Sequence, residues 1–241
     1  MKDRFIPGKA FECLRAAVAF FTPKMCTAWA EPHDGEPCVF VCNHARAYGP
    51  IAMCAHFPLA KQSTPWIISN MMHAKEVPAY VRRDFWWQRD RWYTKLLDYT
   101  LAYVYALLLP PVMRGIKGIP VYHDMRSVTT FRDSVKAVRA GRNLIIFPEQ
   151  PTGFEGYADV LSDGFALIAK QVFRATGKAL KFYPVYVDWG AHTIDVGRAI
   201  RYDPHSADPD QTKHIVQQLS ATVLHKNVPA EQEEAPAAAQ K

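Results

Sequence analysis

The sequence predicts an α/β fold with an open, mostly parallel sheet, helices on both faces, an N-terminal helix and an Arg/Trp-rich helical insertion. Short apolar runs alternate along the chain with longer segments whose apolar residues recur at helical spacing, which is typical of such folds. Several short runs are continuously apolar, as expected for strands covered on both faces. With 241 residues and an apolar fraction of 49%, the chain can bury a sizeable core.

The predicted strands are short, and three of them lead into chemically unusual loops. They are residues 38–42, 66–69, 119–122, 144–147 and 182–188, with a final hairpin formed by residues 192–196 and 199–202. In an open α/β sheet, functional residues follow the carboxyl ends of the strands. This rule selects the loops 43–50, 123–127 and 148–153.

Amphipathic patterns predict the helices between these strands. The helices cover residues 10–29, 127–140, 162–176 and 210–224. Ser127 is expected to cap the second helix, and Gly141 and Gly177 are expected to end the second and third.

The same patterns predict how the chain is divided. We expect residues 1–226 to form the α/β domain, with residues 73–114 as a helical, membrane-facing insertion. Residues 227–241 have almost no large apolar side chain, which predicts a disordered tail.

The net charge indicates the kind of partner, and the cysteine content indicates the cellular compartment. The formal net charge of +6 suits anionic partners, which include a membrane surface, nucleic acid and phosphorylated or CoA-bearing ligands. The five cysteines lie in the first quarter of the chain and follow no secretory signal, so we expect free thiols in a reducing, intracellular compartment.

The sequence disfavours both a metal site and a membrane-spanning helix. Cys38, Cys42, His44, Cys54 and His56 could be imagined as metal ligands, but Cys38 and Cys42 flank an apolar strand rather than a turn, which disfavours a metal site. The most apolar helical segment, residues 99–113, is too short to span a bilayer and ends in two prolines.

Polar residues follow the predicted strands at the loops selected above. Asn43 and His44 come directly after the first strand, and an imidazole held there is suited to act as a general base near neutral pH. Phe147, Pro148 and Glu149 end a later strand. On spacing alone, His44 could equally cap the next helix, and Glu149 could be an ordinary solvated residue.

A third loop carries possible anion contacts. His123, Asp124 and Arg126 follow the strand at residues 119–122, and His123 or Arg126 could bind an anionic headgroup. The alternative is an ordinary surface loop.

These segments, in this order, resemble the sequence blocks of the glycerol-phosphate and lysophosphatidate acyltransferase family. The matching segments are Asn43-His44, Gly118 to His123, Phe147-Pro148-Glu149, Gly164-Phe165-Ala166 and Tyr183-Pro184-Val185. The resemblance implies an acyltransferase that moves a fatty acyl group from acyl-CoA or acyl carrier protein to a lipid or lysolipid hydroxyl. It implies no metal or bound organic cofactor.

The resemblance also implies roles for individual residues. The family histidine takes the proton of the acceptor hydroxyl, and the glutamate helps to hold the acceptor. We therefore expect His44 and Glu149 to be catalytic, and Asn43, His123, Arg126, Phe147 and Pro148 to bind substrate.

Two departures from the family pattern bear on activity. The aspartate that orients the family histidine is replaced by Gly49, and the arginine of the third block is missing from residues 150–153. Loss of an orienting acid costs a catalytic triad about 10^4 in turnover. Asp34, Asp84 and Asp124 are candidate substitutes for the acid. The missing arginine disfavours lysophosphatidate and favours an unphosphorylated hydroxyl or amine as acceptor.

The insertion between the first two blocks combines arginine with tryptophan. Residues 82–93 hold most of these side chains, and the apolar stretch 101–113 follows. Such a composition is typical of a membrane interface. A partly buried helix pair is the main alternative, and stacking on nucleic acid is disfavoured. We expect a cytoplasmic protein that is peripheral on the inner face of the membrane.

Two other functions compete with this one. A catalytically impaired, lipid-binding relative of the family is favoured by Gly49. A thiol or serine hydrolase is disfavoured, because the chain has no Gly-x-Ser-x-Gly motif and no glycine-rich turn around a cysteine.

Overall fold

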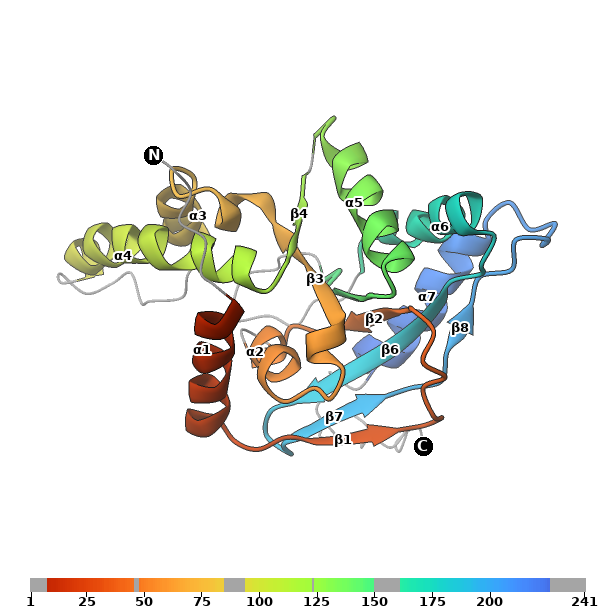
Figure 1. Ribbon diagram of the computed structural model, residues 1–241, viewed down its shortest axis with the longest axis horizontal. Coiled ribbons are helices and arrows are strands. Elements are labelled where there is room, and N and C mark those ends of the chain that lie inside the picture. Colours follow the sequence, from red (N-terminus) through yellow and green to blue (C-terminus); the bar gives the residue numbers. More distant parts are fainter. Residues whose placement is uncertain (1–7, 46–47, 85–93, 123, 150–160, 226–241) are drawn as a thin grey trace, which may run out of the picture.

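An eight-stranded sheet with helices on both faces forms the structure, as the sequence predicted. The computed structural model describes residues 8–45, 48–84, 94–122, 124–149 and 161–225. The strand order is β1-β7-β6-β2-β5-β3-β4, with β8 paired to β6 (Figure 1). The strands are β1 Cys26–Trp29, β2 Val39–Cys42, β3 Ser63–Ile68, β4 Ile119–Val121, β5 Asn143–Ile146, β6 Lys181–Asp188, β7 Thr193–Val196 and β8 Ile200–Arg201.

The centre of the sheet is parallel. Strand β2 pairs in parallel with β5 on one side and β6 on the other, and β3 pairs in parallel with β5 and β4. Strands β7 and β8 run antiparallel to β6. The carboxyl ends of five strands, β2 to β6, therefore meet at one edge of the sheet.

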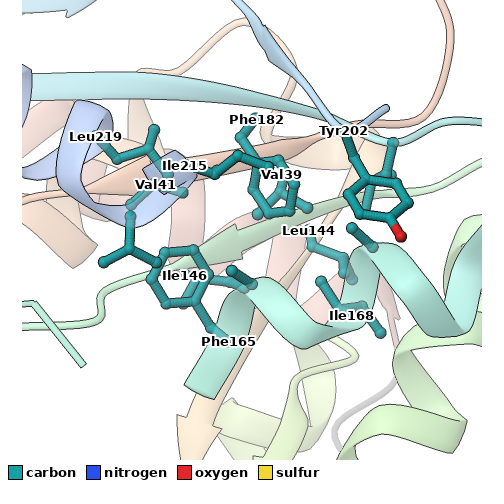
Figure 2. Close-up of a cluster of buried hydrophobic side chains, with 14 of the residues drawn as sticks. Val39, Val41, Leu144, Ile146, Phe165, Ile168, Phe182, Tyr202, Ile215 and Leu219 are labelled. Carbon is teal, nitrogen blue, oxygen red and sulfur yellow. The ribbon is translucent and has the colours of Figure 1, made fainter. Parts of the chain in front are cut away.

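Each face of the sheet has its own apolar core. Val39 and Val41 of β2 face a cluster that includes residues of α5 (Ser127–Arg139), α6 (Ile168–Thr176) and α7 (Gln211–His225), as Figure 2 shows. Phe40 and Cys42 point the other way, toward a cluster that includes Met53 of α2 (Tyr48–Ala55). Successive strand residues point to opposite faces, so a strand covered on both faces is apolar at every position.

The helical insertion forms a pair of helices beside the sheet in Figure 1. It consists of α3 (Val77–Asp84) and α4 (Thr94–Gly115), and Val77 and Val81 pack against Ala102. Helix α4 continues through Pro110 and Pro111, although the sequence suggested that the prolines end it. The N-terminal helix α1 (Gly8–Phe21) contacts α4 where Phe11 meets Gly115.

Three local predictions were wrong. The first helix ends at Phe21 rather than residue 29, because Pro23 follows and residues 26–29 form β1 against β7. The predicted final hairpin does not form, since β7 and β8 pair with different parts of β6. Ser127 is the first helical residue, and Arg126, which provides no side-chain cap, precedes it.

The structure shows how two predicted helix ends are formed and in which state the cysteines are. Gly141 and Gly177 follow α5 and α6 with φ angles of +76° and +71°, which a glycine adopts without strain. All five cysteines are free thiols. None of the helices in the described ranges is long and apolar enough to cross a membrane. The predicted tail at residues 227–241 lies outside these ranges.

A partly buried histidine joins α1 to α2 and predicts a pH effect on stability. The His56 Nε2 atom lies 2.8 Å from the Thr22 hydroxyl oxygen, and burial lowers the pKa of His56 below its ordinary value of 6.5. The unfolded chain therefore takes up a proton more readily than the folded protein as the pH falls. This contribution to stability is present above about pH 6.5 and is lost as the pH falls through that range.

We expect His56→Gln to flatten the fall in unfolding free energy between about pH 7 and pH 5, measured by urea titration at several pH values. His205→Gln changes an exposed histidine and serves as the control. An unchanged slope in His56→Gln would contradict the assignment.

Candidate active site

Three neighbouring strands deliver the candidate residues to one edge of the sheet. Asn43 and His44 follow β2, Phe147 to Glu149 follow β5, and Trp189 follows β6. Because β5 and β6 flank β2 in parallel, the chain after β2 leaves between the two other loops. The parallel register thus brings together residues that are more than 100 positions apart in the sequence.

An imidazole and a carboxylate meet at this edge. His44 Nδ1 lies 3.4 Å from Glu149 Oε2. The His44 side chain is 41% exposed, whereas that of Glu149 is 11% exposed. The ring of Phe147 lies 5.0 Å from that of His44, centroid to centroid. The imidazole is therefore partly exposed and contacts an acid and an aromatic ring.

Backbone contacts hold Glu149 in place. Glu149 forms an antiparallel bridge with Leu161, and the Ser162 amide donates a hydrogen bond of 2.8 Å to the Pro148 carbonyl. Pro148 is buried and fixes the backbone at the turn. The backbone of Pro148 and Glu149 is thus held by Leu161 and Ser162.

The negative charge of Glu149 affects the pKa of the nearby Cys42 thiol. Burial, and after it the Glu149 carboxylate, raise the pKa of Cys42 well above its ordinary value. Burial likewise raises the pKa of Cys38. Both thiols therefore stay protonated at neutral pH, and a protonated thiol is a poor nucleophile. This disfavours a thiol hydrolase at either of these two cysteines.

Asn43 ties β2 to β6. Its side chain is 1% exposed, its Nδ2 donates to the Val187 carbonyl at 3.1 Å, and its Oδ1 accepts from the Val187 amide at 2.7 Å. The amide group thereby satisfies both backbone groups of Val187 and continues the strand pairing with a side chain. The structure gives Asn43 this supporting role, and its predicted contact with substrate stays a prediction.

A tight turn follows His44 and accounts for Gly49. The Gly49 amide donates a hydrogen bond of 2.7 Å to the His44 carbonyl. A Cβ atom at position 49 would lie 2.4 Å from the Asn43 carbonyl oxygen and 2.6 Å from that of His44. These contacts involve backbone atoms and cannot be relieved by moving a side chain. The turn in this chain therefore requires glycine where the family pattern has aspartate.

This geometry predicts that restoring the motif aspartate harms the protein. We expect Gly49→Asp and Gly49→Ala to destabilise the fold alike, by about 1–3 kcal/mol, because the clash begins at Cβ. A chain of this size should then lose several degrees in Tm, at about 2–4 °C per kcal/mol, measured by calorimetry. Gly164→Ala is the control, since a Cβ there meets nothing within 4 Å. A Gly49→Asp protein of wild-type stability would contradict this account of the turn.

The second predicted binding loop lies further along the sheet. Arg126 is exposed and forms a bidentate ion pair with Asp124, with Nη2 and Oδ2 2.8 Å apart, and its guanidinium lies 4.5 Å from the centre of the Tyr122 ring. Strand β4 is three places from β2, which corresponds to about 14 Å across the sheet. His123 and residues 150–153 lie outside the described ranges.

The acid that faces His44 is none of the predicted substitutes. Asp34 pairs with Lys181, which begins β6 at the opposite edge of the sheet, and Asp124 pairs with Arg126. The side chain of Asp84 is not among those described. Glu149 was predicted as an acceptor contact, and its position beside His44 could only be inferred from the parallel pairing of β2 with β5.

Sequence reasoning missed an aromatic pair at the same edge. The rings of Tyr48 and Trp189 stack with centroids 4.5 Å apart and planes 13° apart. Tyr48 opens α2 just after the His44 turn, and Trp189 follows β6. The contact depends on β6 lying next to β2, and local sequence patterns do not define which strands are neighbours.

A cavity and the possible metal ligands lie apart from this pair. A cavity of about 290 Å³ between β1, β6, β7 and α7 is lined by residues that include Trp29, Tyr186 and Thr222, and by none of the predicted site residues. Among the described residues, no three His, Cys, Asp or Glu side chains are grouped as metal ligands would be. The candidate site is therefore defined by the chemistry of His44 and Glu149.

Comparisons with known proteins add a distant structural likeness. No family model matches the sequence, and no curated protein matches it. Among solved structures, the chain is similar to the 1-acyl-sn-glycerophosphate (LPA) acyltransferase PlsC from Thermotoga maritima, with 12% sequence identity and a TM-score of 0.47. The match covers 95% of this chain and 85% of that one.

Proposed function

We propose that this protein transfers a fatty acyl group from acyl-CoA or acyl carrier protein to a hydroxyl of a lipid or lysolipid acceptor. The observation that carries the proposal is the contact of 3.4 Å between His44 Nδ1 and Glu149 Oε2 at the carboxyl edge of the sheet. The two residues belong to separate sequence blocks that resemble those of glycerolipid acyltransferases. In the family pattern an aspartate orients the histidine, and this chain has Gly49 at that position. We assign the orienting role to Glu149 instead.

The orientation of the ring assigns a role to each nitrogen. Nδ1 faces the carboxylate, which leaves Nε2 as the atom that accepts the acceptor's proton. A carboxylate at Nδ1 holds the imidazole in the required tautomer and stabilises the imidazolium that forms. The partial exposure of His44 gives a substrate hydroxyl access to the ring.

The reaction needs no component besides the two substrates. As Nε2 takes the hydroxyl proton, the oxygen attacks the thioester carbonyl carbon and a C–O bond forms. The tetrahedral intermediate then collapses, the C–S bond breaks, and the imidazolium returns the proton to the leaving sulfur. The products are an ester and a free thiol.

The described basic groups favour an acceptor without a phosphate close to the reacting hydroxyl. Arg126 is paired with Asp124, and its strand lies about 14 Å from β2. The third-block arginine is absent from the sequence. A lipid hydroxyl that carries its anionic group elsewhere, or none, is therefore the proposed acceptor class.

We expect His44→Ala and Glu149→Gln each to lower the rate of acyl transfer, by roughly 10^3 to 10^4 for the histidine and about 10^2 to 10^4 for the glutamate. The assay follows thiol release from a long-chain acyl-CoA in the presence of mixed lipid acceptors. Glu149→Gln keeps the size of the side chain and removes only its charge.

Glu36→Gln is the matched control, because Glu36 pairs with Lys178 and Lys181 at the opposite edge of the sheet. Wild-type protein that releases no thiol with any acceptor, or His44→Ala protein of full activity, would instead favour the lipid-binding alternative.

Membrane association is the second part of the proposal, and α4 supports it. Residues at four positions on one side of α4, Tyr103, Val104, Leu107 and Leu108, are each at least 49% exposed. The opposite side of α4 packs on α3 through Ala102 and Leu109. An apolar cluster of this kind on a surface indicates an interaction site rather than the scattered exposure that is normal.

Further aromatic and basic side chains favour a lipid surface as the partner. Phe20 and Phe21 at the carboxyl end of α1 are each 83% exposed, and α1 contacts α4 nearer its other end, at Phe11. The Arg82 guanidinium lies 5.7 Å from the centre of the Tyr103 ring with its Nε and Nη2 atoms buried, so the cationic contribution comes from the whole chain, which carries a charge of +6. Apolar side chains beside cations suit the boundary between acyl chains and anionic headgroups.

We expect Leu107→Glu with Leu108→Glu to reduce cosedimentation with vesicles of mixed neutral and anionic phospholipid by about tenfold or more, because both carboxylates would have to enter the apolar layer. Val128→Glu with Met125→Glu is the control, since these residues are also exposed but lie at the start of α5. Equal binding by both double variants would contradict docking through α4. Dimerisation of the wild-type protein that the α4 variant abolishes would assign this face to a second copy instead.

A further inference from the structure

The segment that carries His44 is held in an unfavourable conformation. Ala45, the next residue, has a φ angle of +43°, in the left-handed region that residues with a Cβ rarely adopt. The Tyr48 amide donates to the Ala45 carbonyl at 3.3 Å and the Gly49 amide to the His44 carbonyl at 2.7 Å, which closes the turn. Such a conformation persists only where the surrounding structure fixes it.

The end of β6 provides the surrounding contacts on one side. Val187 receives the Asn43 side chain, and two residues later Trp189 stacks on Tyr48. Trp189 and Ala45 both pack against the core cluster on the α2 face of the sheet. Asn43 therefore holds the start of the turn against β6, and Tyr48 holds its end against the residue that follows β6.

The Tyr48–Trp189 stack lies on the other side of β2 from Glu149 and supplies neither member of the proposed catalytic pair. It lies on the β6 side of β2, whereas Glu149 lies on the β5 side. Tyr48 is 42% exposed, so little of the core depends on its side chain. Tyr48 belongs to the segment that follows His44, so the stack contacts the chain next to the imidazole without supplying either member of the pair.

We infer that Trp189 is a positioning residue of this site: by stacking on Tyr48, it fixes the left-handed turn that directs the His44 imidazole to Glu149. The inference deepens the proposed function, and the kinetic effect that it predicts rests on that function. Its structural consequence does not, because the orientation of the ring can be observed without any acyl transfer.

The test compares Tyr48→Ala, Trp189→Ala, Tyr48→Phe and Trp189→Phe with the wild-type chain. The readout is the ring carbon–proton NMR signal of His44, assigned by its loss in His44→Ala. We expect both alanine variants to shift or broaden this signal, as Glu149→Gln does, and both phenylalanine variants to keep it, because they retain an aromatic stack.

Trp66→Ala is the matched control. Trp66 packs on Phe131 in the other core and donates to Ser134, so its loss should lower stability without moving the His44 signal. A wild-type His44 signal in folded Tyr48→Ala would overturn the inference, as would an equal change in Trp66→Ala. Tyr48→Ala keeps the test valid if Trp189→Ala fails to fold.

The kinetic readout separates positioning from substrate contact. Positioning predicts that kcat falls about tenfold in Tyr48→Ala while KM for the thioester and the acceptor stays within about twofold. A raised KM at unchanged kcat would overturn the inference and make the stack a substrate contact. If the wild-type chain transfers no acyl group, the NMR result still decides the positioning role, and only the proposed function fails.

Discussion

The parallel pairing of β2 with β5 is the constraint on which the candidate site depends. Val39 lies opposite Leu144 and Val41 opposite Ile146, and this register places the residues that follow each strand at the same edge. His44 and Glu149 can meet only because both strands run in the same direction at adjacent positions. Strand β2 is apolar at every position because a core cluster covers each of its faces, so the same core that stabilises the fold fixes the geometry of the pair.

The precision of the site depends on its surroundings more than on any single contact. A non-glycine residue in the left-handed region costs of order 1–3 kcal/mol. An aromatic pair such as Tyr48 and Trp189 contributes about 0.5–1.5 kcal/mol. The stack alone is thus comparable to the strain at Ala45 or smaller, and the hydrogen bonds from Asn43 to Val187 and from Gly49 to His44 are needed as well. At position 49 this arrangement leaves no room for any side chain.

Local patterns predicted the fold class and the strand ends, and they could not predict which strands are neighbours. The apolar run at residues 38–42 and the polar pair Asn43 and His44 were sufficient to select His44 as a candidate base. Strand β1 was missed because it is short and alternately exposed, and it depends on pairing with β7. The partnership of Glu149 with His44 is likewise a property of the strand order. The family pattern places an acid at position 49, whereas the carboxylate that lies beside His44 in this fold is that of Glu149, after the neighbouring strand β5.

A double-mutant cycle on the acyl-transfer rate constant tests the central claim most directly. It compares the wild-type chain, His44→Ala, Glu149→Gln and the combination in single-turnover experiments with a long-chain acyl-CoA. If Glu149 acts through the His44 imidazole, the second substitution costs little once the first is present, and the losses are strongly non-additive. Losses that multiply independently, with Glu149→Gln as costly in the His44→Ala background as in the wild type, would contradict a working pair.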